Sequence, residues 1–326
     1  MAHRHTVLFL TDRGLRHQGD ALRAAPPELI VTMLRQPSRN KMLRLLCEAE
    51  FLISERSGEV DAEMIAAGAQ LRLIQRLGSP PHDIDLEAAR SAGVPVSAWP
   101  VHVAVMVAEH MVMQMLALAR RLKETMAIAT EAGDWGQPSR RTDEDIFAYD
   151  WSAREKIGEI RGRTVGILGY GEIGAELARR LRAFAPARIL YHKRNRLPEK
   201  AEAELGLDYV PRHQLLAASD FVCNLLPYSP QTDMLLGAEH LATLKPGAFL
   251  VSCGSGSVID EAALAQAIET GQLGGAALDT FEWEPIRPGN PLIPLARQGY
   301  NVLLTPHIAA GGSSAAAEER RHDYSN

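Results

Sequence analysis

The sequence has few cysteines, no excess of basic charge and no obvious site for a metal. Its 326 residues include three cysteines, Cys47, Cys223 and Cys253, which lie far apart. This number and spacing predict neither a disulfide framework nor a metal site, and they suit a reducing cytoplasm. Lys and Arg number 35 against 40 Asp and Glu, a net charge of -5. That balance argues against a nucleic-acid binder, because phosphates attract a basic surface.

The sequence also lacks an uninterrupted apolar run long enough to cross a membrane. The most apolar long stretch, residues 101–119, is interrupted by His102, Glu109, His110 and Gln114. A membrane-spanning helix needs about 20 predominantly apolar residues, so we expect a buried helix and no membrane partner. The apolar run near the N-terminus is too short for a signal peptide and is typical of a first strand. With 46% hydrophobic residues, the chain is long enough for two domains.

Short apolar strands alternate with amphipathic helices in the first hundred residues. The pattern predicts strands at 6–10, 29–34, 51–54, 71–78 and 94–99, and helices at 61–69 and 85–93. Such alternation favours a mostly parallel sheet covered on both faces. A long helix is expected over about 101–125, followed by a polar segment at 131–162 that we interpret as an exposed arm. Its aromatic residues could pack on a second subunit or on their own domain.

A second alternation begins at residue 164 and predicts a doubly wound unit of about 140 residues. Strands are expected at 164–168, 188–192, 220–226, 248–253, 274–279 and 301–307, and helices at 172–184 and 260–271. We therefore predict an α/β protein with one domain at 101–307, and residues 1–100 and 308–326 would form a second, discontinuous domain.

The stretch TVGILGYGEIGAELARRL contains a GxGxxG pattern at Gly169, Gly171 and Gly174. A β-branched strand precedes it and an Ala/Leu-rich helix follows, which is the context that dinucleotide binding requires. The first glycine permits the tight turn, the second lets a pyrophosphate approach the backbone, and the third allows close helix packing. Unpaired N–H groups at the helix start would face the phosphates. A purely structural glycine turn is the alternative.

No carboxylate follows the next strand at the position where NAD-binding proteins hold the adenosine ribose. His192, Lys193 and Arg194 stand there instead, with Arg196 nearby, and no acidic residue appears before Glu199. These cations would bind a 2′-phosphate, so the sequence predicts NADP(H) in preference to NAD(H). The alternative is a solvated basic loop that binds nothing.

With these features the chain resembles the D-isomer-specific 2-hydroxyacid dehydrogenase family over nearly its whole length. The resemblance is carried by DIDLEAARSAGVPV, VAEH, GRTVGILGYGEIG, LLPYSPQT, LKPGAFLVSCGSGSVIDEAAL, GAALDTFEWEP and LTPHIAA, in this order. It implies a Rossmann-type cofactor domain, a flavodoxin-like substrate domain and substrate bound in the cleft between them. It further implies an NAD(P)-dependent oxidoreductase and a homodimer formed through the cofactor domain and its arm.

The resemblance also assigns roles to individual residues. His307 of TPH would be the acid/base, since an imidazole changes charge near neutral pH, and Glu284 would orient it. Asp279 would contact the nicotinamide carboxamide, unless it only caps a turn. The remaining cofactor contacts would come from the GxGxxG turn with Tyr170, Glu172 and Ile173, and from Pro227, Thr232, Cys253 and Gly254. Cys253 could equally be a small buried side chain without chemistry.

Two departures from the family pattern affect substrate binding. Ser255 occupies the position of the family's catalytic arginine, which forks onto the substrate carboxylate, and the spacings to Glu284 and His307 fix this register. The substrate loop, normally GxGxD, begins at Gly78 and Ser79 but continues with Pro80 and Pro81, which have no N–H to donate. Its last position is His82 instead of Asp.

Three interpretations of these departures remain open. Another cation, such as Arg76, His82 or His102, could replace the arginine. The enzyme could reduce a carbonyl substrate that needs no arginine. Alternatively, the chain could be a weak or inactive relative that binds cofactor as a sensor. Because Glu284, His307 and the cofactor motifs are intact, we favour retained chemistry on a 2-hydroxy/2-oxo acid or a related carbonyl compound.

Overall fold

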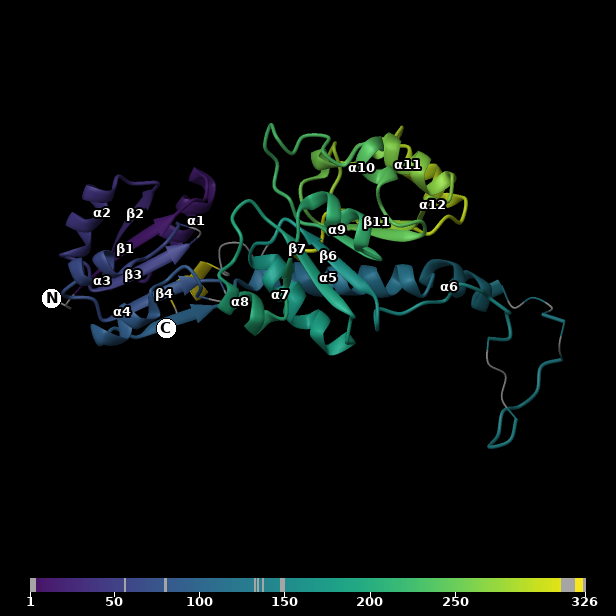
Figure 1. The fold of residues 1–326 in the computed structure, drawn as a ribbon, viewed down its shortest axis with the longest axis horizontal. Helices are drawn as coiled ribbons and strands as arrows, with labels where there is room; N and C mark the ends of the chain where they lie inside the picture. Colours follow the sequence, from purple (N-terminus) through teal and green to yellow (C-terminus); the bar gives the residue numbers. More distant parts are fainter. Residues whose placement is uncertain are drawn as a thin grey trace. The chain divides into compact units, whose positions relative to one another are not determined.

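The computed structural model describes residues 4–55, 57–78, 81–131, 133, 135–136, 138–146, 150–311 and 320–324. The chain divides into two compact units, each built around a parallel sheet (Figure 1). Unit 1 comprises residues 1–106, 197–201 and 310–326, and unit 2 comprises residues 107–196 and 202–309. The α/β class is thus confirmed, whereas the predicted domain roles and limits stay a prediction.

Unit 1 contains a five-stranded parallel sheet of order β2-β1-β3-β4-β5. Its elements are β1 (His5–Thr11), α1 (Leu15–Ala24), β2 (Leu29–Arg35), α2 (Arg39–Leu46), β3 (Phe51–Glu55), α3 (Ala62–Ala67), β4 (Leu73–Leu77), α4 (Leu86–Ser91) and β5 (Val96–Trp99). Alternate side chains of β1 enter two different apolar clusters, Leu8 and Leu10 in one, Val7 and Phe9 in the other. Both faces of the sheet are therefore covered, and the strand order is that of flavodoxin-like folds.

The C-terminal residues Arg320–Tyr324 form a short 3-10 helix in unit 1. The Arg320 guanidinium contacts buried Glu55 at 2.8 and 3.2 Å, and the Tyr324 hydroxyl donates to Ala21 O. The expected helix-like start of this segment falls at 312–319, outside the described residues. Burial raises the pKa of Asp323 from 3.8 to about 7, which nearby Arg320 offsets only in part.

A carboxyl group whose pKa is raised on folding makes the free energy of unfolding depend on pH. Below about pH 4 the Asp323 carboxyl holds its proton in both the folded and the unfolded chain, and its stabilising contribution to folding is complete. As the pH rises toward 7, the unfolded chain releases this proton first, so the contribution is lost. We expect Asp323→Asn to raise Tm, and to raise it more at pH 8 than at pH 5. Thermal unfolding at both pH values measures this, and an equal shift at both would contradict it.

Unit 2 contains a seven-stranded parallel sheet of order β12-β11-β10-β9-β6-β7-β8. The strands are β6 (Thr164–Leu168), β7 (Arg188–His192), β8 (Asp208–Tyr209), β9 (Phe221–Asn224), β10 (Ala248–Ser252), β11 (Leu273–Leu278) and β12 (Val302–Leu304). The connecting helices are α7 (Glu172–Leu181), α8 (Glu199–Leu205), α9 (Arg212–Ala218), α10 (Ala238–Ala242), α11 (Glu261–Glu269) and α12 (Leu292–Arg297). This order is the doubly wound Rossmann arrangement, in which ligands bind at the carboxyl ends of the strands.

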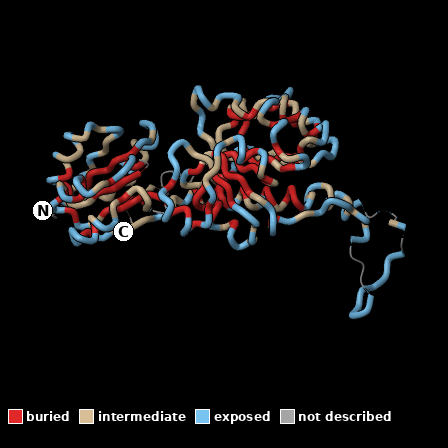
Figure 2. Tube along the Cα trace, viewed as in Figure 1, coloured by how far each residue is buried: buried red, intermediate tan, exposed pale blue. Residues whose placement is uncertain are grey.

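Helices of unit 2 contribute to a large apolar cluster on its sheet. Figure 1 shows α10, α11 and α12 together on one side of the sheet, and their buried leucines join those of α9 and the strands in a single cluster. Figure 2 shows the buried residues concentrated along the strands of both units. The core strands are short and β-branched or leucine-rich because both of their faces are covered.

The predicted long helix at 101–125 is wrong in one respect, because it is two helices. α5 (His102–Ala119) ends before Arg121, whose φ of +50° breaks the α-helix, and α6 (Leu122–Glu131) follows. By length and composition α5 could cross a membrane, but half of its apolar window is buried, including Met111 and Met115. The absence of a membrane partner stays a prediction. Beyond α6, residues 138–146 are exposed and form neither helix nor strand (Figure 2).

Candidate functional site

The glycine turn after β6 has the shape that a pyrophosphate needs. Gly169 adopts a φ of +91°, and a Cβ there would lie 2.7 Å from backbone atoms of Leu225 and Leu226. Gly171 begins α7 with no side-chain cap, and a Cβ there would meet no atom within 4 Å. The start of α7 therefore has open space beside Gly171 at the positive end of the helix dipole, so the turn fits a dinucleotide cofactor.

The other residues of the turn serve mainly to hold it. A Cβ at Gly174 would lie 3.1 Å from the Tyr170 ring, which itself packs on Tyr191. The Tyr170 side chain is 5% exposed, and its burial raises the pKa of the hydroxyl. Glu172 and Ile173 form the half-buried first turn of α7. Tyr170 thus belongs to the core that supports the turn.

Substitutions at the two glycines should separate cofactor binding from folding. Gly171→Val places its side chain in the open space where the pyrophosphate is expected, so we expect a loss of NADH affinity of at least about tenfold with unchanged Tm. Gly169→Ala forces a strained φ and a backbone clash, so it should lower Tm. Cofactor titration and thermal unfolding of both variants test this. Unchanged NADH affinity in Gly171→Val would contradict the assignment.

The basic segment after β7 is less free than the sequence indicates. Arg196 donates to both carboxylate oxygens of Glu202, at 2.8 and 2.7 Å, and Glu202 also accepts from the buried Tyr191 hydroxyl. This pairing lowers the pKa of Glu202 and offsets the charge of Arg196. Half-buried His192 lies 3.0 Å from Val210 O through Nδ1. Lys193 is half-buried and Arg194 is exposed, and both directly follow the carboxyl end of β7.

Thr232 and Pro227 belong to one closed loop after β9. The Thr232 hydroxyl donates to Pro227 O at 2.8 Å and accepts from Ser229 N at 2.8 Å. The loop is also tied to β9, because Leu226 N donates to the side chain of Asn224, a fully buried residue. Thr232 thus closes the loop that contains both predicted cofactor contacts.

Glu284 and His307 form a hydrogen-bonded pair at the carboxyl edge of unit 2. His307 Nδ1 lies 2.7 Å from Glu284 Oε2, and Phe281 N donates to Glu284 Oε1 at 3.1 Å. A carboxylate beside Nδ1 favours the form in which Nδ1–H donates and leaves Nε2 for a substrate. The His307 side chain is 56% exposed, so Nε2 is accessible. The structure therefore brings together the two residues predicted to carry proton transfer.

Buried Asp279 holds the turn that presents His307. Its carboxylate accepts from Thr305 Oγ1 at 2.6 Å, Ile308 N at 3.0 Å and Ala309 N at 2.8 Å. His307 itself has a φ of +53°, a conformation that costs free energy for a residue with a side chain. Because the two N–H groups after His307 both donate to Asp279, this carboxylate compensates that cost. Its predicted contact with the nicotinamide stays a prediction.

Two further side chains reach the same network from α5. His110 Nε2 lies 3.1 Å from Thr305 Oγ1 and 3.6 Å from the Asp279 carboxylate, and Gln114 lies 3.4 Å from Thr305 Oγ1. Sequence reasoning noted VAEH only as part of the family resemblance and gave His110 no role. No local pattern connects two residues that are 195 positions apart.

Ser255 lies in a turn whose backbone is fixed on both sides. A Cβ at Gly254 would lie 2.7 Å from Leu226 O, and one at Gly256 would lie 2.0 Å from the Phe281 backbone. Ser255 N donates to Leu226 O at 2.8 Å, and its hydroxyl lies 3.3 Å from that of Ser257. The hydroxyl pair carries no charge, so this turn offers no cation to an anionic substrate.

Cys253 packs as a small weakly polar side chain. Its Sγ lies 3.6 Å from Gln114 Oε1, and burial and the Asp279 charge raise the pKa of the thiol. A thiol with a raised pKa is a poor nucleophile, which agrees with a packing role. The preceding Ser252 is fully buried and accepts from the Asn224 side chain at 3.1 Å.

Some of the predicted substrate residues of unit 1 already form hydrogen bonds or ion pairs within the protein. Arg76 is 3% exposed and donates to both oxygens of Asp83, at 3.0 and 3.1 Å, so its charge is offset. Gly78 N donates to Trp99 O at 2.6 Å and is not available to a carboxylate. His82 is half-buried and His102 is exposed at the start of α5, while Ser79 and Pro80 lie outside the described residues. Arg76 is thus a poor substitute for the missing arginine.

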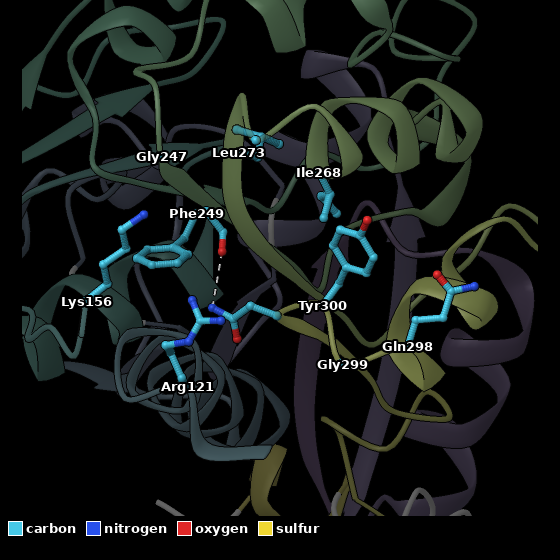
Figure 3. A pocket seen from close by; sticks show the side chains of 12 residues that line it. Arg121, Lys156, Gly247, Phe249, Ile268, Leu273, Gln298, Gly299 and Tyr300 are labelled. Carbon is cyan, nitrogen blue, oxygen red and sulfur yellow. Dashed lines mark hydrogen bonds between the residues drawn. The ribbon is translucent and has the colours of Figure 1, made fainter. Parts of the chain in front are cut away.

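Two cavities of unit 2 lie at the amino-terminal edge of its sheet. One of about 480 Å³ is lined by residues at the starts of β10 and β11 and by Arg121, Lys156 and Tyr300 (Figure 3). A second, of about 310 Å³, shares Lys156, Gly247 and Phe249 with it. Cofactors of doubly wound sheets bind at the carboxyl edge, so neither cavity is the predicted cofactor site.

Comparison with known proteins identifies the family. The model of the D-isomer specific 2-hydroxyacid dehydrogenase NAD binding domain matches residues 112–309. The chain belongs to the D-isomer specific 2-hydroxyacid dehydrogenase family. This membership confirms the resemblance drawn from the motifs. Members of this family use a nicotinamide cofactor to oxidise 2-hydroxyacids or to reduce the corresponding 2-oxoacids. The glycine turn and the Glu284–His307 pair suit these two requirements.

Curated relatives and solved structures agree with this family. Glyoxylate reductase of Korarchaeum cryptofilum is 34% identical over 84% of this chain and 77% of its own. D-3-phosphoglycerate dehydrogenase of Mycobacterium leprae is 34% identical over 87% of this chain, but the match spans only 49% of that protein. The crystal structure of a glyoxylate reductase from Paecilomyes thermophila matches with a TM-score of 0.55 and 27% identity, covering 99% of this chain and 93% of that one.

Proposed function

We propose that this family member is a reductase of small 2-oxoacids or related carbonyl compounds, with NADP(H) as its preferred cofactor. The observation that carries the proposal is the Glu284–His307 pair, held over the same sheet edge as the open glycine turn. Related proteins of 34% identity are named glyoxylate reductase and D-3-phosphoglycerate dehydrogenase, which supports this substrate class.

In this proposal the protein binds the cofactor and supplies the proton. The turn at Gly169–Gly174 would hold the pyrophosphate, and the cofactor, when bound, supplies a hydride to the carbonyl carbon. His307 Nε2 donates a proton to the carbonyl oxygen during reduction and accepts it during oxidation. Glu284 stabilises the charged imidazole through Nδ1, and Asp279 holds the His307 turn in place.

Turnover of both cofactors against a carbonyl panel tests the activity. We expect oxidation of NADPH with glyoxylate, hydroxypyruvate or a related 2-oxoacid, followed as loss of absorbance of the reduced nicotinamide. Tight cofactor binding without turnover of any 2-oxoacid, aldehyde or ketone would instead favour a cofactor sensor.

Cofactor preference is a separate expectation of this proposal. Lys193 and Arg194 lie where a 2′-phosphate is expected, so kcat/KM with NADPH should exceed that with NADH. Arg194→Gln should lower the NADPH/NADH ratio by about tenfold, since a charge-assisted contact is lost. Arg188→Gln is the matched control, because Arg188 lies at the other end of β7 and pairs with Asp208. A wild-type preference for NADH would contradict this part of the proposal.

We also propose a cytoplasmic homodimer. The segment after α6 exposes Ile146 and Trp151, and α6 exposes Leu122 and Met126, which gives an apolar surface for a second copy. Light scattering after size-exclusion chromatography tests the dimer, and a monomer at micromolar concentration would overturn it.

A further inference from the structure

The four loops that follow β9, β10, β11 and β12 contain one lysine or arginine. The loops after β9, β10, β11 and β12 in unit 2 cover residues 225–237, 253–260, 279–291 and 305–309, all of them described. Within these four loops Arg287 is the only lysine or arginine. An anion that reaches His307 from this edge therefore has Arg287 as its one permanently charged partner in these loops.

The segment that contains Arg287 lies directly against the turn that contains Ser255. Thr280 Oγ1 donates to Gly254 O at 2.7 Å, and the Phe281 backbone covers Gly256. Two further bonds reach the Glu261 carboxylate, from Glu282 N at 3.2 Å and from the Asn290 side chain at 2.7 Å. Arg287 thus belongs to a segment fixed along the loop that lacks the family's arginine, and it shares that segment with Glu284.

The Arg287 guanidinium lies over the ring of Trp283 and is exposed. Its Cζ lies 3.3 Å from the centroid of the Trp283 ring, and Trp283 is 49% exposed. A cation over an aromatic ring uses the face of the guanidinium, so the N–H groups along its edge can still donate to a ligand. Among the described residues no ion pair to Arg287 is found, so this edge has no carboxylate from the protein.

We propose that Arg287, oriented by Trp283, binds the carboxylate of the substrate in place of the arginine that Ser255 replaces. A planar guanidinium edge matches a carboxylate with two parallel N–H···O bonds, which selects 2-oxocarboxylates over uncharged carbonyl compounds. Arg287 is then a specificity-determining residue, and Trp283 positions it. This inference rests on the proposed reduction of 2-oxoacids.

The test compares an anionic substrate with an uncharged one. In Arg287→Gln we expect KM for pyruvate or glyoxylate to rise about tenfold or more, while kinetic constants for methylglyoxal, an uncharged analogue of pyruvate, stay unchanged. Arg287→Lys should recover part of the loss, since it keeps the charge without the planar fork. Trp283→Leu should raise KM for the anion by a smaller factor. Arg297→Gln, an exposed arginine on α12, is the matched control and should match wild type.

A binding measurement keeps this test independent of turnover. Oxamate, an unreactive analogue of a 2-oxoacid, is titrated into the protein saturated with NADPH. Arg287→Gln should weaken oxamate binding about tenfold or more, and Ser255→Arg in the same chain should restore it. Equal oxamate affinity in wild type and Arg287→Gln overturns the inference even if 2-oxoacids are reduced. Conversely, loss of oxamate affinity without turnover of any 2-oxoacid would support Arg287 and overturn the proposed reaction.

Discussion

His307→Asn should lower kcat for carbonyl reduction by about a hundredfold to ten-thousandfold and leave NADPH affinity unchanged. Asparagine fits the same turn and tolerates its positive φ, but it has no group that exchanges a proton near neutral pH. The predicted cofactor residues lie on other loops of the sheet edge, so we expect cofactor binding to survive. Stopped-flow or steady-state turnover measures kcat, and fluorescence titration measures the affinity.

Companion variants show whether this loss comes from proton transfer. Glu284→Gln removes the charge that faces Nδ1 at 2.7 Å, so it should lower kcat less than His307→Asn and alter the pH profile of kcat. His213→Asn on α9 is the control, because His213 is exposed and lies outside the sheet edge loops. A His307→Asn enzyme with nearly wild-type kcat would exclude His307 as the acid/base.

Ser255→Arg should raise kcat/KM for glyoxylate or hydroxypyruvate by about tenfold to a hundredfold. The new guanidinium adds a charge-assisted contact to the substrate carboxylate in a turn that now offers only two hydroxyl groups. The gain should be confined to substrates with a carboxylate, so methylglyoxal serves as the internal control. Ser257→Arg, which adds the same charge two positions away, is the matched control variant.

The outcome of Ser255→Arg also locates any remaining defect. A large gain would show that Glu284, His307 and the cofactor turn are competent as they stand. No gain would contradict the expectation, and the next residues to vary would then be those of the predicted substrate loop in unit 1. There Gly78 N is engaged by Trp99, Pro81 has no N–H, and Arg76 is paired with Asp83.

Sequence patterns predicted the features of this protein that depend on residues close together in the chain. The βα alternation and the glycine motif depend on neighbours within a few residues, so the α/β class, most strands of both sheets and the glycine turn after β6 were predicted correctly. The two-residue strand β8 was missed, because it is too short to show an apolar pattern. The break at Arg121 was missed, because the apolar pattern continues through it. Likewise, the pairing of Arg196 with Glu202 crosses from a loop to a helix, and no pattern of charges shows it.

In the candidate site, too, short-range motifs were predicted and long-range contacts were not. Glu284 and His307 were found through motifs, but the contacts of Asp279 with the turn after His307 join residues about 30 positions apart. His110 and Thr305 lie still farther apart in the sequence. Only the folded chain brings such residues together, so their roles follow from distances and not from spacing.

The two glycines beside Ser255 have a consequence for how this protein can acquire new substrates. Neither position accepts a side chain, because the backbones of Leu226 and Phe281 occupy that space. Residue 255, which lies between them, is therefore a place where a side chain can be exchanged while the neighbouring backbone keeps its course. We expect an exchange at residue 255 to change the charge that this turn presents at little cost to folding, so it needs no compensating substitution in the turn.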